Sequence, residues 1–162
     1  MEKVFVYGTL KRNQPNHDVL NDGKNGKATF LAEANTIQKY PLVISTKYNI
    51  PFLLHKASTG HLINGEIYNV DTKMLAFLDE FENHPNFYVR QKTCVKLTND
   101  DIVECWIYFL TNYPDNFLQL KYFSDYDSSG THGLAYVSRY LRDPQDVSQF
   151  LNWNNLNKKV CS

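Results

Sequence analysis

The sequence predicts an α+β domain in which a closed or strongly curved β-sheet accompanies one principal helix. Two observations support this expectation: strand-like segments outnumber helical ones, and only residues 70–83 show a long, clear helical periodicity. Closure or strong curvature is expected because it leaves few strand edges exposed. A length of 162 residues with 43% hydrophobic content fits one domain with a substantial core.

Six segments have the composition of strands, since they are rich in β-branched and aromatic residues and bounded by Gly, Asn, Asp or Pro. They are residues 3–7, 28–32, 42–44, 62–69, 88–97 and 102–109. The polar run 98–101 is typical of a turn, so the last two strands are expected to pair as an antiparallel hairpin. Cys94 and Cys105 lie on its two arms and could face each other. Neither has an evident base partner, so both are interpreted as core or edge thiols.

Residues 70–83 are predicted to form the principal helix, with Asp71 as its N-cap and Pro85 just beyond its end. Its apolar stripe comprises Met74, Leu75, Phe77, Leu78 and Phe81. A second helix is expected over residues 144–151, which begin with a proline and place Val147, Phe150 and Leu151 on one side.

One carboxylate of the principal helix, Glu82, falls on the apolar side. At about 100° per residue, Glu82 lies roughly 50° from the centre of the stripe, whereas Asp79 and Glu80 lie roughly 110° and 150° away and are expected at the surface. If the stripe is buried, desolvation raises the pKa of Glu82 toward neutrality, as a general acid/base requires. The alternative is a frayed last turn before Pro85, with the carboxylate in solvent. Periodicity alone favours this alternative.

The charge balance argues against a polyanionic partner. The chain has 17 Lys and Arg residues and 17 Asp and Glu residues, without a basic cluster, so nucleic-acid binding is not expected. No leader precedes the first strand-like segment, and no apolar run approaches the length of a membrane span. The odd set Cys94, Cys105 and Cys161 fits free thiols in a reducing compartment. We expect a cytoplasmic protein without a nucleic-acid or membrane partner.

The histidines do not indicate a metal site. No two of them have the close spacing that zinc ligands commonly show. They are His17, His55, His61, His84 and His132. We therefore expect no metal.

Several ordered motifs together resemble the γ-glutamylcyclotransferase-like superfamily. They are Val-Phe-Val-Tyr-Gly-Thr-Leu-Lys at 4–11, Tyr-Pro-Leu-Val at 40–43, Gly-Glu-Ile-Tyr at 65–68, and Leu-Asp-Glu-Phe-Glu at 78–82 with Tyr88 following. The γ-glutamylamine cyclotransferase branch is the most similar. That branch is indicated by residues 7–12 with 14–17, by 49–51, and by 126–128 with Gly130 and 132–134.

The resemblance implies a small closed or strongly curved mixed β-barrel with one principal helix and short additional helices. It covers about the first 140 residues, so we predict a domain over 1–140 and a partly helical C-terminal extension over 141–162 without a catalytic role. A monomer is expected, with a homodimer left open.

The activity that the resemblance implies is an intramolecular cyclisation. The α-amine of a γ-glutamyl group attacks its own γ-carbonyl, which closes 5-oxoproline and expels an amine. In the most similar branch the substrate is the small molecule ε-(γ-glutamyl)lysine, which remains when transglutaminase cross-links are degraded, and lysine leaves. No cofactor is implied.

The same resemblance assigns roles to residues of this chain. Glu82 matches the general acid/base, and an α-amine with a pKa of about 8 does need a base before it can attack. Tyr7, Gly8, Thr9 and Leu10 match the loop that binds the α-carboxylate region of the substrate. A strand that ends in glycine fits this task, because it lets backbone N–H groups approach an anionic oxygen.

The polar loop 124–133 is a candidate cover for the substrate. Tyr126 and Ser128 could donate hydrogen bonds near the site, while Asp125 and Asp127 could receive the lysine ammonium. The loop departs from the branch at Ser129 and Thr131. The alternative is a solvated surface loop.

Two alternatives to the implied function remain open at the level of sequence. The first is cyclisation of γ-glutamyl α-amino acids or glutathione, whose leaving groups carry a carboxylate next to the scissile amide and would need cations close to Glu82. The second is a non-catalytic binding module on the same fold, for which a desolvated carboxylate has no evident use.

Overall fold

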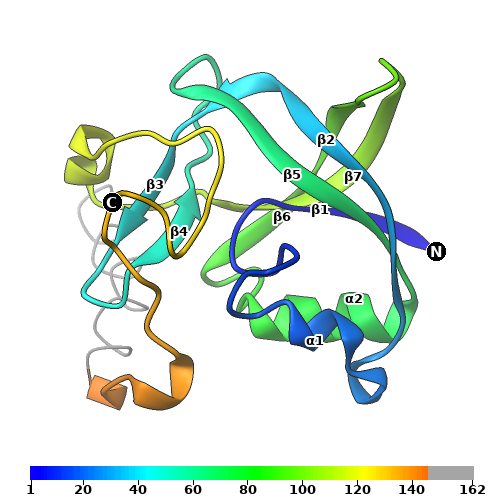
Figure 1. Cartoon of the computed structure of the whole chain (residues 1–162), viewed down its shortest axis with the longest axis horizontal. Coiled ribbons are helices and arrows are strands. Elements are labelled where there is room, and N and C mark those ends of the chain that lie inside the picture. Colours follow the sequence, from blue (N-terminus) through cyan, green and yellow to red (C-terminus); the bar gives the residue numbers. More distant parts are fainter. Residues whose placement is uncertain (146–162) are drawn as a thin grey trace, which may run out of the picture.

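Five strands close into a mixed β-barrel, as the sequence predicts. The computed structural model describes residues 1–145, so Cys161 and most of the helix expected over 144–151 lie outside the described residues. The strands follow one another around the barrel in the order β1-β5-β2-β6-β7, and the parallel pair β1 and β7 completes the ring (Figure 1). Their bounds are β1 Glu2–Val6, β2 Ala28–Tyr40, β5 His61–Val70, β6 Tyr88–Leu97 and β7 Ile102–Leu110.

A separate two-stranded sheet, β3 Leu42–Ser45 with β4 Ile50–Leu53, stands beside the barrel. The strand β4 is absent from the sequence prediction, because Pro51 within it lacks a backbone donor and argues against a strand. In a two-stranded sheet this proline is tolerated. The strand β2 is also longer than predicted: it continues through a polar stretch that stays on the outer surface while Ala34 and Thr36 are buried.

The hairpin predicted from the polar turn 98–101 is confirmed, with β6 and β7 antiparallel over their whole length. The expectation that its cysteines could face each other is wrong. Cys105 pairs with Thr93 and Cys94 pairs with Glu104, so the two thiols point to opposite faces of the sheet. Cys105 is buried and Cys94 is exposed.

The principal helix α2, Thr72–Phe81, begins as predicted at Asp71, whose carboxylate accepts a hydrogen bond from the Met74 N–H at 2.8 Å. The remaining helices are short: α1 Asp18–Asn21, η1 Gly23–Asn25, η2 Asp115–Gln119 and η3 Arg139–Leu141. In Figure 1, α1 and α2 lie together below the barrel, while β3 and β4 lie to its left with the segment that leads to η3.

The strands of the barrel alternate between two buried clusters. The barrel cluster receives side chains from all five barrel strands, among them Phe5, Ala34, Ile67, Val95 and Ile107. The helix cluster packs α2 and β4 against the outer face of the barrel, and its members include Val4, Phe52, Val70, Met74 and Leu78. Because β1 alternates between the two, Val4 and Phe5 face opposite ways, and the end of β1 is held from both sides.

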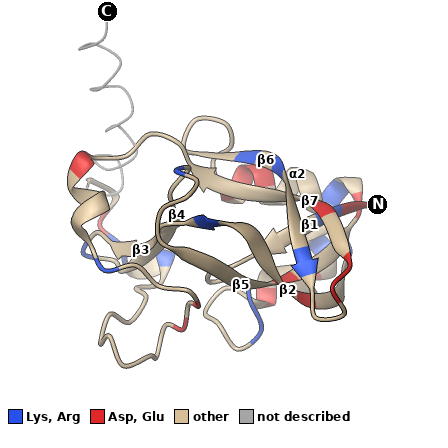
Figure 2. Cartoon of the chain, turned by 90° about the horizontal axis from the view of Figure 1, so that it is seen from above, with Lys and Arg blue, Asp and Glu red and all other residues tan. Residues whose placement is uncertain are grey.

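In the described part of the chain, Lys and Arg are interspersed with Asp and Glu, as Figure 2 shows. Within residues 1–145, no helix has the length and apolar character that crossing a membrane would require.

The packing of α2 predicts a large cost for shortening Leu78, which is fully buried. We expect Leu78→Ala to lower the free energy of unfolding by about 3 kcal/mol, because it leaves a cavity between the helix and the barrel. We expect Leu78→Met to cost less than about 1.5 kcal/mol, since it nearly conserves volume. Urea denaturation at pH 7 measures both, and equal costs would contradict this account of the helix cluster.

Candidate active site

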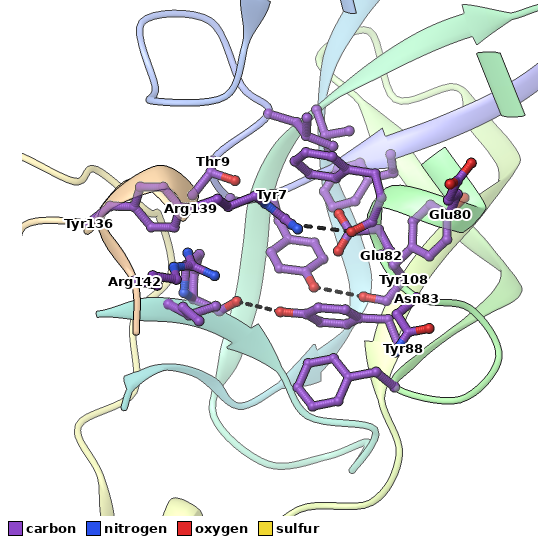
Figure 3. A pocket seen from close by; sticks show the side chains of 18 residues that line it. Tyr7, Thr9, Glu80, Glu82, Asn83, Tyr88, Tyr108, Tyr136, Arg139 and Arg142 are labelled. Carbon is purple, nitrogen blue, oxygen red and sulfur yellow. Dashed lines mark hydrogen bonds between the residues drawn. The ribbon is translucent and has the colours of Figure 1, made fainter. Parts of the chain in front are cut away.

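A pocket of about 200 Å³ opens at the end of β1, between the last turn of α2, the start of β4 and the segment 136–142. Figure 3 shows Glu82 and Asn83 on one side of the Tyr7 ring, with Thr9, Tyr136 and Arg142 on the other. The lining side chains are mostly apolar or aromatic. They include Phe5, Val6, Leu10, Ile50, Pro51, Phe81, Phe87, Tyr88 and Tyr108.

The position of Glu82 follows from how α2 ends. Glu82 is the C-cap residue, and its N–H still bonds to the Leu78 carbonyl at 2.8 Å, so the helical direction of its side chain is kept. Asn83 then turns the chain with a φ of 52°, a conformation that asparagine tolerates. The N–H groups of Asn83 and His84 bond to the carbonyls of Glu80 and Asp79, which is the Schellman pattern. The last turn is therefore closed by hydrogen bonds and does not fray.

The carboxyl of Glu82 is desolvated. Part of the residue stays open toward the pocket, but its carboxyl is surrounded by protein, and burial raises its pKa from 4.5 to about 7. The Arg139 charge opposes this shift. Among the described residues no hydrogen bond to the carboxylate forms, so it is left available to a ligand. Glu80 is exposed, as its place on the helix predicts.

Three tyrosines surround Glu82, and their hydroxyls are bonded within the protein. The Tyr7 hydroxyl donates to the Tyr108 carbonyl at 2.7 Å, and the Tyr88 hydroxyl donates to the Pro51 carbonyl at 3.0 Å. The Tyr108 hydroxyl donates to Asp79 at 2.7 Å, and Asp79 also pairs with Arg90 at 2.8 Å. Asp79 is thus half-buried and not the surface group that the sequence suggests.

These tyrosines remain neutral at physiological pH. Burial, followed by the negative charge of Glu82, raises the pKa of the Tyr7 hydroxyl. Burial also dominates the raised pKa of Tyr88 and of Tyr108, and Glu82 contributes to both. The wall around Glu82 therefore adds no negative charge to the pocket.

The loop after β1 brings unpaired amides to the same pocket. Tyr7, Gly8, Thr9 and Leu10 all line it, as Glu82 does. Within the described part of the chain, the N–H groups of Gly8, Thr9 and Leu10 donate no hydrogen bond. Consecutive amides of this kind form a concave site for an anion. The loop also passes close to β4, since a Cβ on Gly8 would lie 3.1 Å from the Pro51 side chain.

The loop is held from behind by its own continuation. Asn16 donates from its side chain to Thr9 and to the Tyr136 hydroxyl, each at 3.0 Å, and His17 bonds to the Leu10 carbonyl at 2.9 Å. These contacts fix the shape of the loop before any ligand binds.

Arg12 and Glu66 hold the base of the same loop. The buried carboxylate of Glu66 receives both the backbone N–H and the Nε of Arg12, at 2.9 and 3.0 Å. Although burial raises the pKa of Glu66, these hydrogen bonds prevail and lower it overall. Glu66 is therefore ionised and committed to the loop.

The structure does not bring Tyr126 and Ser128 to the pocket wall. Tyr126 is buried in the barrel cluster, and the Ser128 hydroxyl accepts a hydrogen bond from the Tyr136 N–H at 3.0 Å. Asp125 pairs with Lys11 at 2.6 Å, and Asp127 accepts hydrogen bonds from Ser129. The positions of these residues therefore do not support the substrate contacts predicted for this loop. The loop lies behind the pocket and braces Tyr136.

Three pocket residues escaped the sequence reasoning: Tyr136, Arg139 and Arg142. They follow loop 124–133 in a segment without strand or helix periodicity, so no local pattern marks them. The sequence signal that could have indicated this part of the pocket is the pair of arginines three residues apart. Arg139 stacks on the Phe81 ring at 3.9 Å and donates to the Phe81 carbonyl at 3.2 Å. The predicted domain boundary at residue 140 separates these two arginines of one pocket, and the division itself remains a prediction.

No cluster of three His, Cys, Asp or Glu side chains among residues 1–145 could hold a metal ion. The pocket itself offers a carboxylate that can exchange a proton near pH 7, a loop of unpaired amides and two guanidinium groups.

Comparison with known proteins agrees with this geometry. A family model for "Gamma-glutamyl cyclotransferase, AIG2-like" matches residues 4–128. The gamma-glutamylaminecyclotransferase of Bos taurus is 50% identical over 140 residues, which are 86% of this chain and 83% of that protein. The Homo sapiens protein of that name is 46% identical over 153 residues, covering 88% of this chain and 100% of its own.

A solved structure is also similar to this chain. The crystal structure of an AIG2-like protein from Mus musculus superposes with a TM-score of 0.85 at 45% identity, covering 88% of this chain and 99% of that one. Fold and pocket together define a barrel protein with a buried carboxylate beside an amide-lined loop. The chain belongs to the γ-glutamyl cyclotransferase, AIG2-like family.

The raised pKa of Glu82 makes a prediction about stability. Because this pKa is higher in the folded than in the unfolded chain, its contribution to stability is complete below pH 4.5 and is lost as pH rises through about 7. Glu82→Gln lacks this titration. We expect the variant to gain on the order of 3 kcal/mol relative to wild type between pH 4.5 and pH 8.5, because each unit of the pKa shift from 4.5 to about 7 corresponds to about 1.4 kcal/mol.

Urea denaturation of both proteins across that pH range measures the difference, since other titrations are common to the two. A constant difference would show that the carboxyl is not desolvated in the folded protein.

Proposed function

We propose that this protein is a cyclotransferase that converts ε-(γ-glutamyl)lysine into 5-oxoproline and lysine. The observation that carries the proposal is the meeting of the desolvated Glu82 carboxylate and the unpaired amides of Gly8, Thr9 and Leu10 in one pocket. Strong similarity to proteins named gamma-glutamylaminecyclotransferase, over most of their length, supports the same reaction.

In the proposed mechanism Glu82 acts as both base and acid. Its carboxylate takes a proton from the α-ammonium of the substrate, and the α-nitrogen then bonds to the γ-carbon. The bond from this carbon to the ε-nitrogen breaks as Glu82 returns the proton to the leaving amine. Glu82 then takes the second proton from the ring nitrogen and passes it to the freed amine. Two protons thus leave the α-nitrogen and two reach the ε-nitrogen, so no external acid is consumed. A carboxyl with a pKa of about 7 suits exchange with an amine whose pKa is about 8.

The protein has no need of a covalent nucleophile, because attacking and attacked atoms belong to one molecule. Its task is to hold the glutamyl chain folded, with the nitrogen about 3 to 3.5 Å from the carbon. The amides of Gly8, Thr9 and Leu10 would bind the α-carboxylate, which shares a carbon with the α-amine. This places the amine beside Glu82.

One observation favours a second candidate substrate class. Arg139 acts on the charge of Glu82, so a cation lies close to the reacting atoms. A γ-glutamyl α-amino acid or glutathione carries a carboxylate there, next to the scissile amide. Competition among ε-(γ-glutamyl)lysine, γ-glutamylalanine and glutathione separates the two: kcat/KM favouring the α-amino acid compounds would replace the lysine proposal.

We also propose a cytoplasmic location, which the free thiols of Cys94 and Cys105 support. The expected monomer, without a nucleic-acid or membrane partner, stays a prediction.

The proposed role of Glu82 predicts the outcome of a direct assay. Purified protein incubated with ε-(γ-glutamyl)lysine should release 5-oxoproline and lysine, and Glu82→Gln should lower kcat about 10²- to 10⁴-fold, the usual contribution of a general acid/base. Liquid chromatography of both products measures this. Glu104→Gln, which removes an exposed carboxylate on β7, should match wild type. Turnover that survives in Glu82→Gln would remove Glu82 from the mechanism.

The charge of Arg139 predicts a shift in the pH profile. The wild-type kcat/KM should fall as pH drops through about 7, because protonated Glu82 cannot accept a proton. Arg139 lowers the pKa of Glu82, so Arg139→Met should move this acid limb to higher pH. Lys24→Gln, which removes an exposed cation of η1 that does not line the pocket, should leave the limb in place. An acid limb that stays unmoved in Arg139→Met would contradict the coupling.

A further inference from the structure

The segment that carries Arg142 is fastened to the turn between β3 and β4. The Val137 N–H bonds to the Tyr48 carbonyl at 2.9 Å, and the Asp143 N–H bonds to the Tyr48 hydroxyl at 2.9 Å. The Asn49 side chain donates to the Ala135 carbonyl at 2.8 Å. Arg142 is therefore held at one wall of the pocket by contacts on both sides of it.

The Arg142 guanidinium is only partly satisfied. Its Nε donates to the Val137 carbonyl at 3.1 Å, and the group lies over the rings of Tyr136 and Tyr48, at 5.0 and 5.4 Å from their centroids. Its Nη2 is buried and has no hydrogen-bond partner within the described residues. A buried, charged donor without an acceptor is costly, and a ligand that supplies the acceptor recovers the cost.

The missing acceptor is best supplied by an anion. Among residues 1–145, no carboxylate forms an ion pair with Arg142 or with Arg139. Burial lowers the pKa of the Arg142 guanidinium, and the groups that oppose this shift are Tyr136, through its charge and a side-chain hydrogen bond, and Tyr88, rather than a carboxylate. A planar guanidinium binds carboxylates well, since it can donate two parallel hydrogen bonds.

The substrate of the proposed function carries two carboxylates. The glutamyl carboxylate shares a carbon with the α-amine, so it must lie beside Glu82, where the loop of Gly8 to Leu10 has unpaired amides. Arg139 bonds to the carbonyl of Phe81, the residue before Glu82, and acts on the charge of Glu82. In Figure 3, Arg142 lies across the Tyr7 ring from Glu82. Arg142 therefore lies where it could bind the other carboxylate of the substrate, which belongs to the lysine part and is farther from the scissile amide.

The wall between the two ends of the pocket fits a methylene chain. Ile50 and Pro51 of β4 line the pocket, and they come two and three residues after Tyr48, over whose ring Arg142 lies. In the substrate, the whole methylene chain of the lysine lies between the scissile ε-nitrogen and the lysine α-carboxylate. A stem that runs along Ile50 and Pro51 would bring that carboxylate toward Arg142.

We propose that Arg142 binds the α-carboxylate of the leaving lysine and thereby selects ε-(γ-glutamyl)lysine over simple γ-glutamyl alkylamines. This inference rests on the proposed function. It concerns a residue beyond the part of the chain that the family model matches, which ends at residue 128.

The test compares two ligands that differ by the one carboxylate: ε-(γ-glutamyl)lysine and γ-glutamylcadaverine, in which a hydrogen replaces it. Calorimetric titration uses Glu82→Gln, which should bind without turnover. Adding Arg142→Met should weaken binding of ε-(γ-glutamyl)lysine about tenfold or more, as expected for a charged hydrogen bond, and change γ-glutamylcadaverine by less than about twofold. Arg142→Lys should restore part of the loss, and Lys24→Gln should change neither affinity.

The outcomes separate the inference from the proposed function. Equal weakening for both ligands would assign Arg142 to the glutamyl end or to the fold, and no weakening would deny it a binding role; either overturns the inference. Thermal melting of each variant identifies a loss that is due to unfolding. Wild-type protein that releases no 5-oxoproline from either compound overturns the proposed function, while a selective effect of Arg142→Met on binding would still support the subsite. Absence of binding by both ligands counts against both.

Discussion

The exclusion of water from the Glu82 carboxyl is the constraint on which the pocket depends. Keeping a carboxylate away from solvent is unfavourable, and the protein sustains it by closing the end of α2 with backbone hydrogen bonds and by packing the helix against the barrel. The surrounding tyrosines remain neutral and place their hydroxyls on carbonyls or on Asp79. None of them donates to Glu82, because a donor there would favour the charged form and return its pKa toward 4.5.

The barrel supplies the second requirement, which is a fixed distance between that carboxyl and the anion-binding loop. The loop leaves β1, whose residues alternate between the helix cluster and the barrel cluster, so neither face of the strand can move freely. Asn16 and Glu66 then hold the loop from behind. A cyclisation needs this rigidity, because its rate depends on holding two parts of one substrate in a narrow range of distance.

Sequence reasoning succeeded where local patterns carry the information. The periodicity of α2 identified both its buried face and the unusual side of Glu82, and the turn at 98–101 identified the hairpin. The strand β4 was missed because its proline argues locally against a strand, although its position beside the barrel tolerates one. Ordered motifs indicated the family, but they could not show that loop 124–133 turns its side chains toward Lys11 and Tyr136.

Arg139 and Arg142 illustrate the remaining gap most clearly. Their segment reaches the pocket through hydrogen bonds to Tyr48 and Asn49, which lie almost ninety residues earlier in the chain, and no local periodicity encodes such contacts. A polar tail that continues past a recognised family core is easily interpreted as an appendage. Here it forms one wall of the pocket.

The two arginines also affect the charge of the pocket, although neither forms a salt bridge within the described part of the chain. A carboxylate partner for Arg139 would cancel the field that it exerts on Glu82, and a direct Arg139–Glu82 pair would stabilise the charged carboxylate and make it a weaker base. Arg139 instead bonds to the Phe81 carbonyl and stacks on its ring, close enough to moderate the pKa of Glu82 but without pairing with it. The free protein thus keeps the pKa of Glu82 near neutrality, and both guanidinium groups lack a carboxylate partner among residues 1–145. In the proposed complex the lysine carboxylate of the substrate satisfies Arg142, so part of the cost of building the pocket is recovered when the substrate binds.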